Sequence, residues 1–262
     1  MMRSLNTAGT GMVAQQYNLD IISNNLANVN TTSFKQQRAE FQDLMYQTFK
    51  ASGVTTGSTT VNPVSLQIGL GAAFSANASN FAPGPLQATG NPLDVAINGE
   101  GFFQAQRADG QIAYTRDGSL KRDANGLLVT SDGYPIIPEI TIPANATAID
   151  IANNGVVSAI LSGDTEPTQL GQIQIATFSN PAGLSRIGQN MYLQGGASGD
   201  PVLVNPGESG SGDLKSRFLE GSNVSVVDEM VHMILAQRAY EINSKAIQTA
   251  DDMLGQLNQL KR

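Results

Sequence analysis

The sequence predicts an α+β protein in which N- and C-terminal α-helices pair as a coiled coil, with an inserted all-β domain and an extended linker arm. Both ends of the chain carry apolar residues at alternating spacings of three and four. The middle consists of short segments between Gly-containing turns, and a Gly-, Ser- and Thr-rich stretch precedes it. The expected parts, in chain order, are the first helix, the linker and arm, the β domain and the last helix, at 1–34, 35–80, 81–215 and 216–262.

The first helix is predicted from a stripe of about four heptads. One set of apolar positions repeats every seven residues, and a second set, polar at one position, is offset by three. The two sets are Leu5, Met12, Leu19 and Leu26, and Ala8, Gln15, Ile22 and Val29. The helix is expected to end at 30–33, Asn-Thr-Thr-Ser, because these side chains compete for backbone hydrogen bonds.

The same helix is almost uncharged, since Asp20 is the only charged residue from Ser4 to Ser33. A helix that faces water normally carries Lys, Arg and Glu on its polar side. Amides and hydroxyls suit a surface packed against more protein, where charges would be costly to desolvate. The pattern favours termini inside a multi-subunit assembly, and it is also compatible with an ordinary core helix.

The Gly-, Ser- and Thr-rich residues lie at 50–66 and predict a linker or extended arm. From residue 93 the chain is expected to form strands at 93–97 and 101–106, on either side of Asn98-Gly99. Turn dipeptides then recur at intervals of eight, eight and seven residues, the rhythm of a β-meander. They are Asp109-Gly110, Asp117-Gly118, Asn125-Gly126 and Asp132-Gly133. Later strands are expected at 139–143, 148–152, 156–161 and 172–178, and a turn-rich connection at 194–213.

The last helix is predicted from a matching stripe, with Ser222 and Asn223 as N-caps. The stripe is Leu235, Ala239, Ile242, Ala246, Thr249, Met253 and Leu260. Apolar residues at 224–234 keep a shifted phase, which indicates a stutter near residue 232. The simplest packing pairs the two terminal helices with each other and makes the β domain a large insertion.

Composition excludes several classes of function. A net charge of −7 and a pI near 4.6 argue against nucleic-acid binding, which needs a basic face. With no Cys and a single His, thiol catalysis, a His dyad and a multi-His metal centre are excluded. No apolar run is long enough to span a membrane or to serve as a cleaved signal peptide. Any export is therefore expected to use another route.

Two weaker motifs are better explained as turns than as a metal site or a catalytic site. We therefore expect no enzyme, no cofactor and no metal. The stretch 123–126, Asp-Ala-Asn-Gly, resembles the start of a calcium loop but lacks the later ligands. The carboxylates that could form a pair for glycoside cleavage, as in a cell-wall hydrolase, are Asp94, Glu100, Asp117 and Asp132. Asp117 and Asp132 lie in turn dipeptides, where Asp is favoured for backbone reasons. His232 is expected to be a packed or solvated helix residue.

The N-terminal stretch closely resembles the signature region of bacterial flagellar basal-body rod and hook proteins. Its most specific part is SNNLANVNTTSFK, with Ser23, Asn24, Asn25, Leu26, Ala27, Asn28, Phe34 and Lys35 as signature residues. LDVAINGEGFFQ and AYTRDGSLKRDANGLLVTSDGYPI also look like that family. The ending LEGSNVSVVDEMVHMILAQRAYEINSKAIQTADDML most resembles the distal rod branch. Asn6 departs from the family, which often has a large aromatic residue there.

The resemblance implies an axial structural protein, exported by the flagellar type III system, whose terminal helices form a coiled coil around an export channel. Its implied partners are copies of itself, proximal rod proteins, the hook protein, the surrounding ring proteins and the export apparatus. The implied distal rod crosses the periplasm to the outer membrane and transmits torque. A distal-rod-specific segment that keeps the rod straight would lie at 46–66. A proximal rod or hook-type protein is the alternative within the family.

The residues expected at the subunit interface are the apolar stripes of both terminal helices. They are Leu5, Met12, Leu19, Ile22, Leu26, Val29, Leu235, Ala239, Ile242, Ala246, Met253 and Leu260. We also hypothesise that Asn24, Asn25 and Asn28 fix the register between neighbouring subunits, as buried Asn does in coiled coils. A phage-tail-like or adhesive tube protein would share the composition but would not explain signature segments at both ends of one chain.

Overall fold

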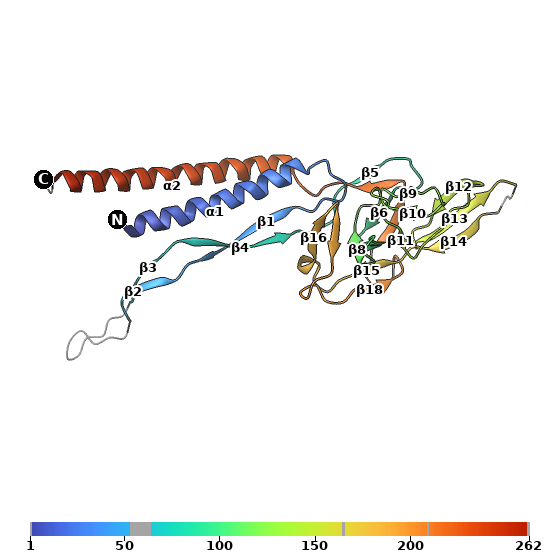
Figure 1. Cartoon of the computed structure of the whole chain (residues 1–262), viewed down its shortest axis with the longest axis horizontal. Helices are drawn as coiled ribbons and strands as arrows, with labels where there is room; N and C mark the ends of the chain where they lie inside the picture. The colour runs from blue at the N-terminus through green and yellow to red at the C-terminus, as the bar shows by residue number, and fades with distance from the viewer. Residues whose placement is uncertain (1, 53–63, 164–165, 209, 261–262) are drawn as a thin grey trace. The chain divides into compact units, whose positions relative to one another are not determined.

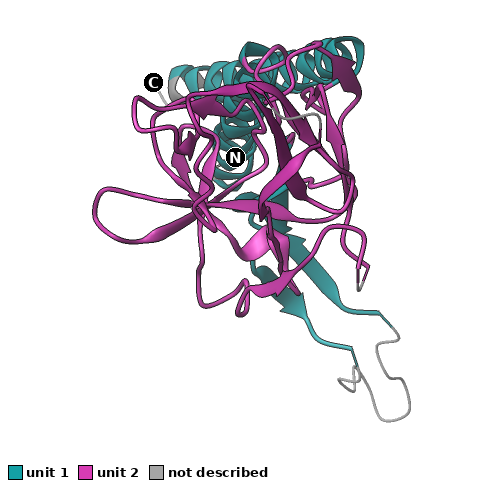
Figure 2. Ribbon diagram, turned by 90° about the vertical axis from the view of Figure 1, so that its right-hand side faces the viewer, with its two compact units in different colours: residues 1–27, 37–79, 225–262 teal, residues 28–36, 80–224 magenta. Residues whose placement is uncertain are grey.

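A computed structural model describes residues 2–52, 64–163, 166–208 and 210–260. The prediction of an α+β chain with terminal helices and a mostly β middle is confirmed. The chain forms two compact units, coloured separately in Figure 2. The helix unit comprises Met1–Ala27, Gln37–Ser79 and Ser225–Arg262, and the β unit comprises Asn28–Gln36 and Asn80–Val224. Residues 53–63, part of the expected arm, lie outside the described residues.

The helix unit contains two long helices and a two-stranded ribbon. The helices α1 and α2 lie side by side, and the strands pair antiparallel as β1 with β4 and β2 with β3 (Figure 1). Their bounds are α1 Met2–Ala27, α2 Val226–Leu260, β1 Gln37–Asp43, β2 Tyr46–Lys50, β3 Leu66–Gly69 and β4 Ala72–Ser79. Within the described residues, neither helix combines the length and hydropathy needed to cross a bilayer.

The two helices contact each other, but two residues of the apolar stripe expected on α2 are not covered by this contact. Ala236 and Ala250 of α2 are buried, whereas Leu235 and Ile242 of the predicted stripe are 61% and 65% exposed. On α1, a Cβ added to Gly11 would lie 3.0 Å from the side-chain nitrogen of Asn243. Small residues therefore line this contact, because they let two helix backbones approach closely. The structure does not confirm the expected coiled-coil pairing of the two stripes.

The N-cap of α2 also differs from the prediction. The helix begins at Val226, and the Ser225 carbonyl accepts a hydrogen bond from the Glu229 amide at 3.0 Å. The Ser225 hydroxyl lies 3.5 Å from the Asp228 amide, in the usual place of a capping side chain. Ser222 and Asn223 do not cap the helix: the Ser222 hydroxyl accepts a hydrogen bond from the Val224 amide, and the side-chain oxygen of Asn223 accepts one from the Gln36 amide.

The β unit is organised around one large sheet. Its strand order is β16-β17-β8-β7-β15-β18, and β11 also pairs with β7. A three-stranded sheet, β12-β13-β14, and the pairs β19-β6, β20-β5 and β10-β9 complete the unit. The bounds are β5 Leu86–Ala88, β6 Val95–Asn98, β7 Phe102–Gln106, β8 Ile112–Thr115, β9 Lys121–Arg122, β10 Leu128–Val129, β11 Ile136–Ile137, β12 Ala146–Ile151, β13 Val156–Leu161, β14 Thr168–Gln172, β15 Ile175–Thr177, η1 Pro181–Gly183, β16 Ser185–Gly188, β17 Met191–Leu193, β18 Val202–Val204, β19 Asp213–Ser216 and β20 Phe218–Glu220.

The predicted meander is right for the turns at 109–110, 125–126 and 132–133, and wrong for the turn at 117–118 and for its long-range pairing. The turns at 109–110 and 125–126 join β7 to β8 and β9 to β10, with both glycines at positive φ. The strands on either side of Asn98-Gly99 do not pair with each other, since β6 pairs with β19. The segment 139–143 forms only one isolated bridge, between Thr141 and Leu127. A turn dipeptide specifies the bend but not which distant strand completes the sheet.

Two clusters of buried side chains form the core of the β unit. The larger cluster is aliphatic apart from Phe103, and the smaller one is mostly aromatic, with Phe102, Tyr114, Phe178 and Tyr192 in contact. The larger cluster is Val95, Ile97, Phe103, Ala105, Leu120, Leu128, Ile136, Ile140, Ile142, Ile151, Val157, Ile173, Ile175 and Leu214. Each large apolar side chain buried in this way stabilises the fold by roughly 1.5–3 kcal/mol.

Gly118 allows two backbone segments of this core to touch, and this makes a testable prediction. A Cβ on Gly118 would lie 1.6 Å from the Val95 carbonyl oxygen, whereas one on Gly196 would meet nothing within 4 Å. Gly118→Ala is therefore expected to destabilise the chain by roughly 3 kcal/mol, the upper end of an overpacking cost. Gly196→Ala is the control, with little expected effect. Equal urea midpoints for the two variants would contradict the close approach.

Candidate assembly interface

The exposed side of α2 carries an uninterrupted apolar surface, which we call the α2 ridge. It consists of Val227, Met230, Val231, Ile234 and Leu235, each between 51% and 71% exposed. Successive helix residues are about 100° apart, so Ile234 projects about 160° away from Ala236, which is buried. The ridge thus lies opposite the side of α2 that contacts α1. An apolar patch of this kind on a soluble protein is characteristic of an interaction site.

The interface residues expected from the sequence fall into several environments. On α2, Leu235, Ile242, Ala246 and Met253 are exposed and Ala239 is half-buried. The side chain of Leu260 lies outside the described residues. The N-terminal members are buried or half-buried: Leu5, Met12, Leu19, Ile22, Leu26 and Val29. The exposed residues of α2 are available to a second molecule, and their assignment to a subunit interface remains a prediction.

Two of the signature amides, Asn25 and Asn28, make hydrogen bonds within the chain. Asn25 is buried, its side-chain nitrogen donates to the Gln37 carbonyl at 2.8 Å, and its side-chain oxygen accepts from the Gln37 amide at 2.9 Å. This pair of bonds fixes the first residue of β1 against α1 within the helix unit. Asn28 accepts a hydrogen bond from the Thr31 hydroxyl at 3.1 Å. The absence of charge near the end of α1 is thus partly explained by packing within the chain.

The ribbon provides a second exposed apolar surface. Met45, Tyr46 and Phe49 on or beside β2 are 82%, 54% and 45% exposed. Leu66 and Ile68 of the paired strand β3 are 52% and 44% exposed. A lone two-stranded ribbon buries little of its own surface, so these side chains could be covered only by further contacts.

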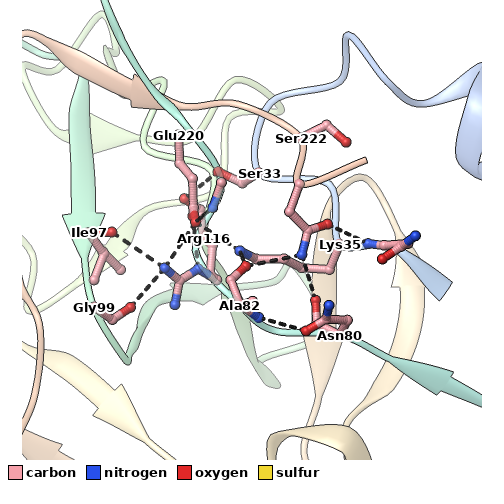
Figure 3. A network of polar contacts seen from close by, with 12 residues as sticks. Ser33, Lys35, Asn80, Ala82, Ile97, Gly99, Arg116, Glu220 and Ser222 are labelled. Atoms are coloured by element: carbon pink, nitrogen blue, oxygen red, sulfur yellow. Dashed lines mark hydrogen bonds and ion pairs between the residues drawn. The ribbon is translucent and has the colours of Figure 1, made fainter. Parts of the chain in front are cut away.

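The most buried polar feature of the molecule is an ion cluster in the β unit, shown in Figure 3. The Glu220 carboxylate accepts hydrogen bonds from the Lys35 ammonium at 2.8 Å and from the Arg116 Nε at 2.9 Å. The side chains of Lys35 and Glu220 are fully buried, and that of Arg116 is 2% exposed. The cluster therefore holds two cations and one anion out of contact with water.

Backbone carbonyls and amides satisfy the rest of the cluster. Arg116 donates to the carbonyls of Gly99 at 2.9 Å and Gly101 at 3.0 Å, and Lys35 donates to the Ala82 carbonyl at 2.8 Å. The Gly84 amide donates to Glu220 at 2.9 Å. Buried charges are tolerated only when their hydrogen bonds are completed in this way. The cluster thereby fastens residues 33–36, where the chain enters the β unit, to the last strand of that unit, β20.

No motif in the sequence points to Arg116 or Glu220, and Lys35 is predicted only as a signature residue. All three lie in segments quoted for the family resemblance, but they are far apart along the chain. The only relevant signal in the sequence is that charged residues are scarce, at 14% of the chain. Such scarcity is compatible with specific partners for the charged residues that are present. Periodicity carries no information on such pairs.

The cluster shifts the pKa values of its members. Burial, followed by the charge of Arg116, lowers the pKa of Lys35 from 10.5 to about 8, and Glu220 offsets this only in part. Burial raises the pKa of Glu220, but the charge and hydrogen bonds of Arg116 and then of Lys35 outweigh it, so that the pKa lies below 4.5. Glu220 therefore contributes stability above pH 4.5, and this contribution is lost as the pH falls through its folded pKa.

Lys35 gives a pH prediction of the same sign in the alkaline range. Between pH 8 and pH 10.5 the unfolded chain keeps the Lys35 proton while the folded chain has lost it, so the free energy of unfolding rises with pH through this group. Relative to Lys35→Met, the unmodified chain should gain on the order of 3 kcal/mol across this range. Urea titrations at each pH measure the difference. Lys121→Met, at an exposed lysine, should show no such trend, and an unchanged difference for Lys35→Met would refute the shift.

Asp94 and Asp117, two of the carboxylates weighed as catalytic groups, and Asp123 of the calcium-like stretch make local hydrogen bonds. The Asp94 carboxylate accepts a hydrogen bond from the side-chain nitrogen of Asn91 at 2.9 Å, and the Asp117 carboxylate accepts from the backbone amide and the hydroxyl of Ser119. The Asp123 carbonyl accepts from the Gly126 amide at 2.9 Å, which closes the turn between β9 and β10. These contacts stabilise the local backbone.

Comparison with known proteins decides the family. The chain is 51% identical over 260 residues to the flagellar basal-body rod protein FlgG of Buchnera aphidicola, which spans 99% of this chain and 100% of the relative. The chain belongs to the flagellar basal-body rod protein family. Profiles of this family match 5–35 (flagella basal body rod protein), 96–159 (flagellar hook protein FlgE/F/G D1 domain) and 215–260 (flagellar basal body rod FlgEFG protein C-terminal).

Other relatives of this basal-body rod protein agree. Flagellar basal-body rod protein FlgG of Borreliella burgdorferi is 51% identical over 264 residues, and that of Bacillus subtilis is 43% identical over 267 residues. Each match spans all of both chains. The resemblance to the rod and hook proteins, and to the rod branch in particular, is confirmed. The chain is a structural subunit of the basal-body rod in the flagellum and is not an enzyme.

Proposed function

We propose that this rod subunit polymerises through its terminal helices into the distal rod, the drive shaft that transmits motor torque to the hook and encloses the export channel. The observation that carries the proposal is the α2 ridge, five apolar side chains exposed on the side of α2 opposite α1. Burial of each such side chain would contribute roughly 1.5–3 kcal/mol. In a single chain these side chains are exposed, so they make no such contribution. In a polymer, the ridge would be covered by neighbouring subunits.

A repeated head-to-tail contact explains how such a surface gives a rod. When two different surfaces of one chain meet and the rotation does not close, the product is an open helical filament. Torque transmission requires stiffness, and stiffness requires many packed contacts per subunit. The amide-rich α1 would lie in the inner layer as a coiled coil with α2 helices around the channel, and the β unit would form an outer layer.

The ribbon would supply the distal-rod-specific contact. The exposed Tyr46, Phe49, Leu66 and Ile68 lie in or at the edge of 46–66, the segment that resembles the straightening insertion of distal rod proteins. An exposed apolar ribbon can order against neighbouring subunits and gain the burial that it lacks alone. In this role it would wedge between subunits and prevent the curvature of a hook.

The remaining partners follow from the position of a distal rod. They are the proximal rod proteins at one end, the hook protein at the other and the ring proteins of the periplasm and outer membrane around the shaft. Export through the flagellar type III apparatus, without a cleaved signal peptide, would bring the subunit to the growing end. The rod would span from the periplasm to the outer membrane.

Negative-stain electron microscopy of the concentrated full-length chain tests the proposal. We expect straight tubes from the full-length chain and only monomers from a chain that lacks 1–34 and 222–262. Curved tubes would favour a hook-type role and count against straightening by 46–66. Monomers from both chains, with ordered termini in the full-length one, would contradict assembly through the helices.

A further inference from the structure

The helix unit contains an apolar groove that the proposed polymer has to fill. It runs between α1 and the ribbon, has a volume of about 630 Å³ and is lined by residues that include Leu5, Val13, Tyr17, Leu44, Ala72 and Phe74. Tyr17 and Phe74 stack with ring centroids 5.1 Å apart and form part of its wall. No residue of α2 lines it. The groove is therefore a surface separate from the α2 ridge, although both belong to the helix unit.

The groove is open to solvent despite its apolar character. Val13 is 52% exposed and Tyr17 is 48% exposed. None of the lining residues is charged. A groove of this size and composition matches the sites that take apolar ligands or side chains, which usually measure about 300–1,000 Å³.

We infer that the occupant of this groove is the α2 ridge of a second copy of this chain. The ridge and the groove are complementary in chemistry, because neither contains a charged residue that would have to be desolvated. The ridge is also short enough for the groove: Val227 to Leu235 covers about 12 Å of helix, and the α1 wall from Leu5 to Tyr17 covers about 18 Å. A helix that lays an apolar face into an apolar groove is a common recognition mode.

The inference rests on the proposed function and deepens it, since it names the two surfaces that meet. A ridge on one element and a groove on two others form a heterologous contact, in which each copy donates a ridge and receives one. Contact between two ridges would instead be isologous and would stop at a dimer. Of the two contacts, only the one between groove and ridge can therefore add further subunits and extend a filament.

A photo-crosslinker in the groove tests the pairing without assuming a register. Full-length chains with p-benzoyl-phenylalanine in place of Tyr17, or in a second variant of Val13, would be polymerised, irradiated and digested for mass spectrometry. Mixing ¹⁵N-labelled with unlabelled chains separates crosslinks between chains from those within one chain. The expected crosslinks join the groove to the peptide that carries Val227 to Leu235 of another chain.

The outcomes separate this inference from the proposed function. The same probe in place of Gln16, an exposed α1 residue outside the groove, should give at least tenfold less crosslinking to the ridge. If tubes form but the groove probes crosslink to another surface, or only within their own chain, the pairing is wrong and polymerisation stands. If the unmodified chain forms no tubes, the proposed function fails and the pairing falls with it.

A charge exchange gives an independent readout. Val13→Lys alone and Ile234→Glu alone should each abolish tubes, because each places an unpaired charge in an apolar contact. Chains that carry both changes should recover tubes, since each groove lysine then meets a ridge glutamate. A double variant as defective as either single variant would contradict direct contact between the two positions.

Discussion

Replacing Glu220 by Gln is expected to lower the free energy of unfolding of the β unit by about 3–5 kcal/mol, a large fraction of the roughly 5–15 kcal/mol that stabilises an ordinary domain. The substitution keeps the shape of the side chain but removes its charge. Lys35 and Arg116 would then remain as two buried cations without an anion, since both side chains are at most 2% exposed. The cost is that of the uncompensated charges and exceeds the value of the ion pairs themselves.

A second substitution distinguishes this explanation from a general loss of packing. In the Glu220→Gln background, Lys35→Met removes one of the two uncompensated cations while it keeps the apolar stem. Part of the lost stability should return, so the two changes should be clearly non-additive. Additive losses would show that the residues contribute through shape alone.

Near-ultraviolet circular dichroism in urea can measure these variants in the full-length chain. The buried Tyr114 and Tyr192 report on the β unit, because both lie in its aromatic cluster. Glu139→Gln, at an exposed carboxylate of the same unit, provides the matched control and should change stability by less than about 0.5 kcal/mol. A loss below about 1 kcal/mol for Glu220→Gln would refute the proposed role of the cluster.

The second large effect concerns assembly and leaves folding untouched. Leu235→Glu places a carboxylate at the C-terminal end of the α2 ridge, where the side chain is 61% exposed in the single chain. The monomer should fold normally, because the carboxylate remains in water. In a polymer the same group would be buried in an apolar contact at a cost of about 2–5 kcal/mol.

This cost should raise the protein concentration needed for tube formation by at least about 100-fold, since each 1.4 kcal/mol corresponds to a factor of ten. Sedimentation of tubes over a concentration series measures it, and the urea midpoint of the monomer checks the fold. Gln237→Glu adds the same charge at an exposed α2 position outside the ridge and should polymerise nearly normally. Unchanged sedimentation for Leu235→Glu would contradict burial of the ridge.

Local patterns anticipated the elements but not their partners. The 4-3 spacing found both helices, and the Asp-Gly and Asn-Gly dipeptides found two hairpin turns, because such signals lie within a few residues of each other. The cap of α2 was misplaced by two residues, since 222–225 offers several side chains able to cap. The pairing of β6 with β19 joins residues more than a hundred positions apart, and no local signal encodes that distance.

The sequence by itself determined the family, the α+β class and the presence of an apolar face on each terminal helix, because hydrophobic periodicity is a property of neighbouring residues. Only the tertiary structure decided which face of α2 is covered. The hydrophobic effect is non-directional, so an apolar stripe in the sequence predicts that one face of a helix is apolar but does not predict which element covers that face. Small residues at Gly11, Ala236 and Ala250 allowed the closer approach and left Leu235 and Ile242 in water. The ion cluster is tertiary for the same reason: Lys35, Arg116 and Glu220 meet only after the whole β unit has folded around them.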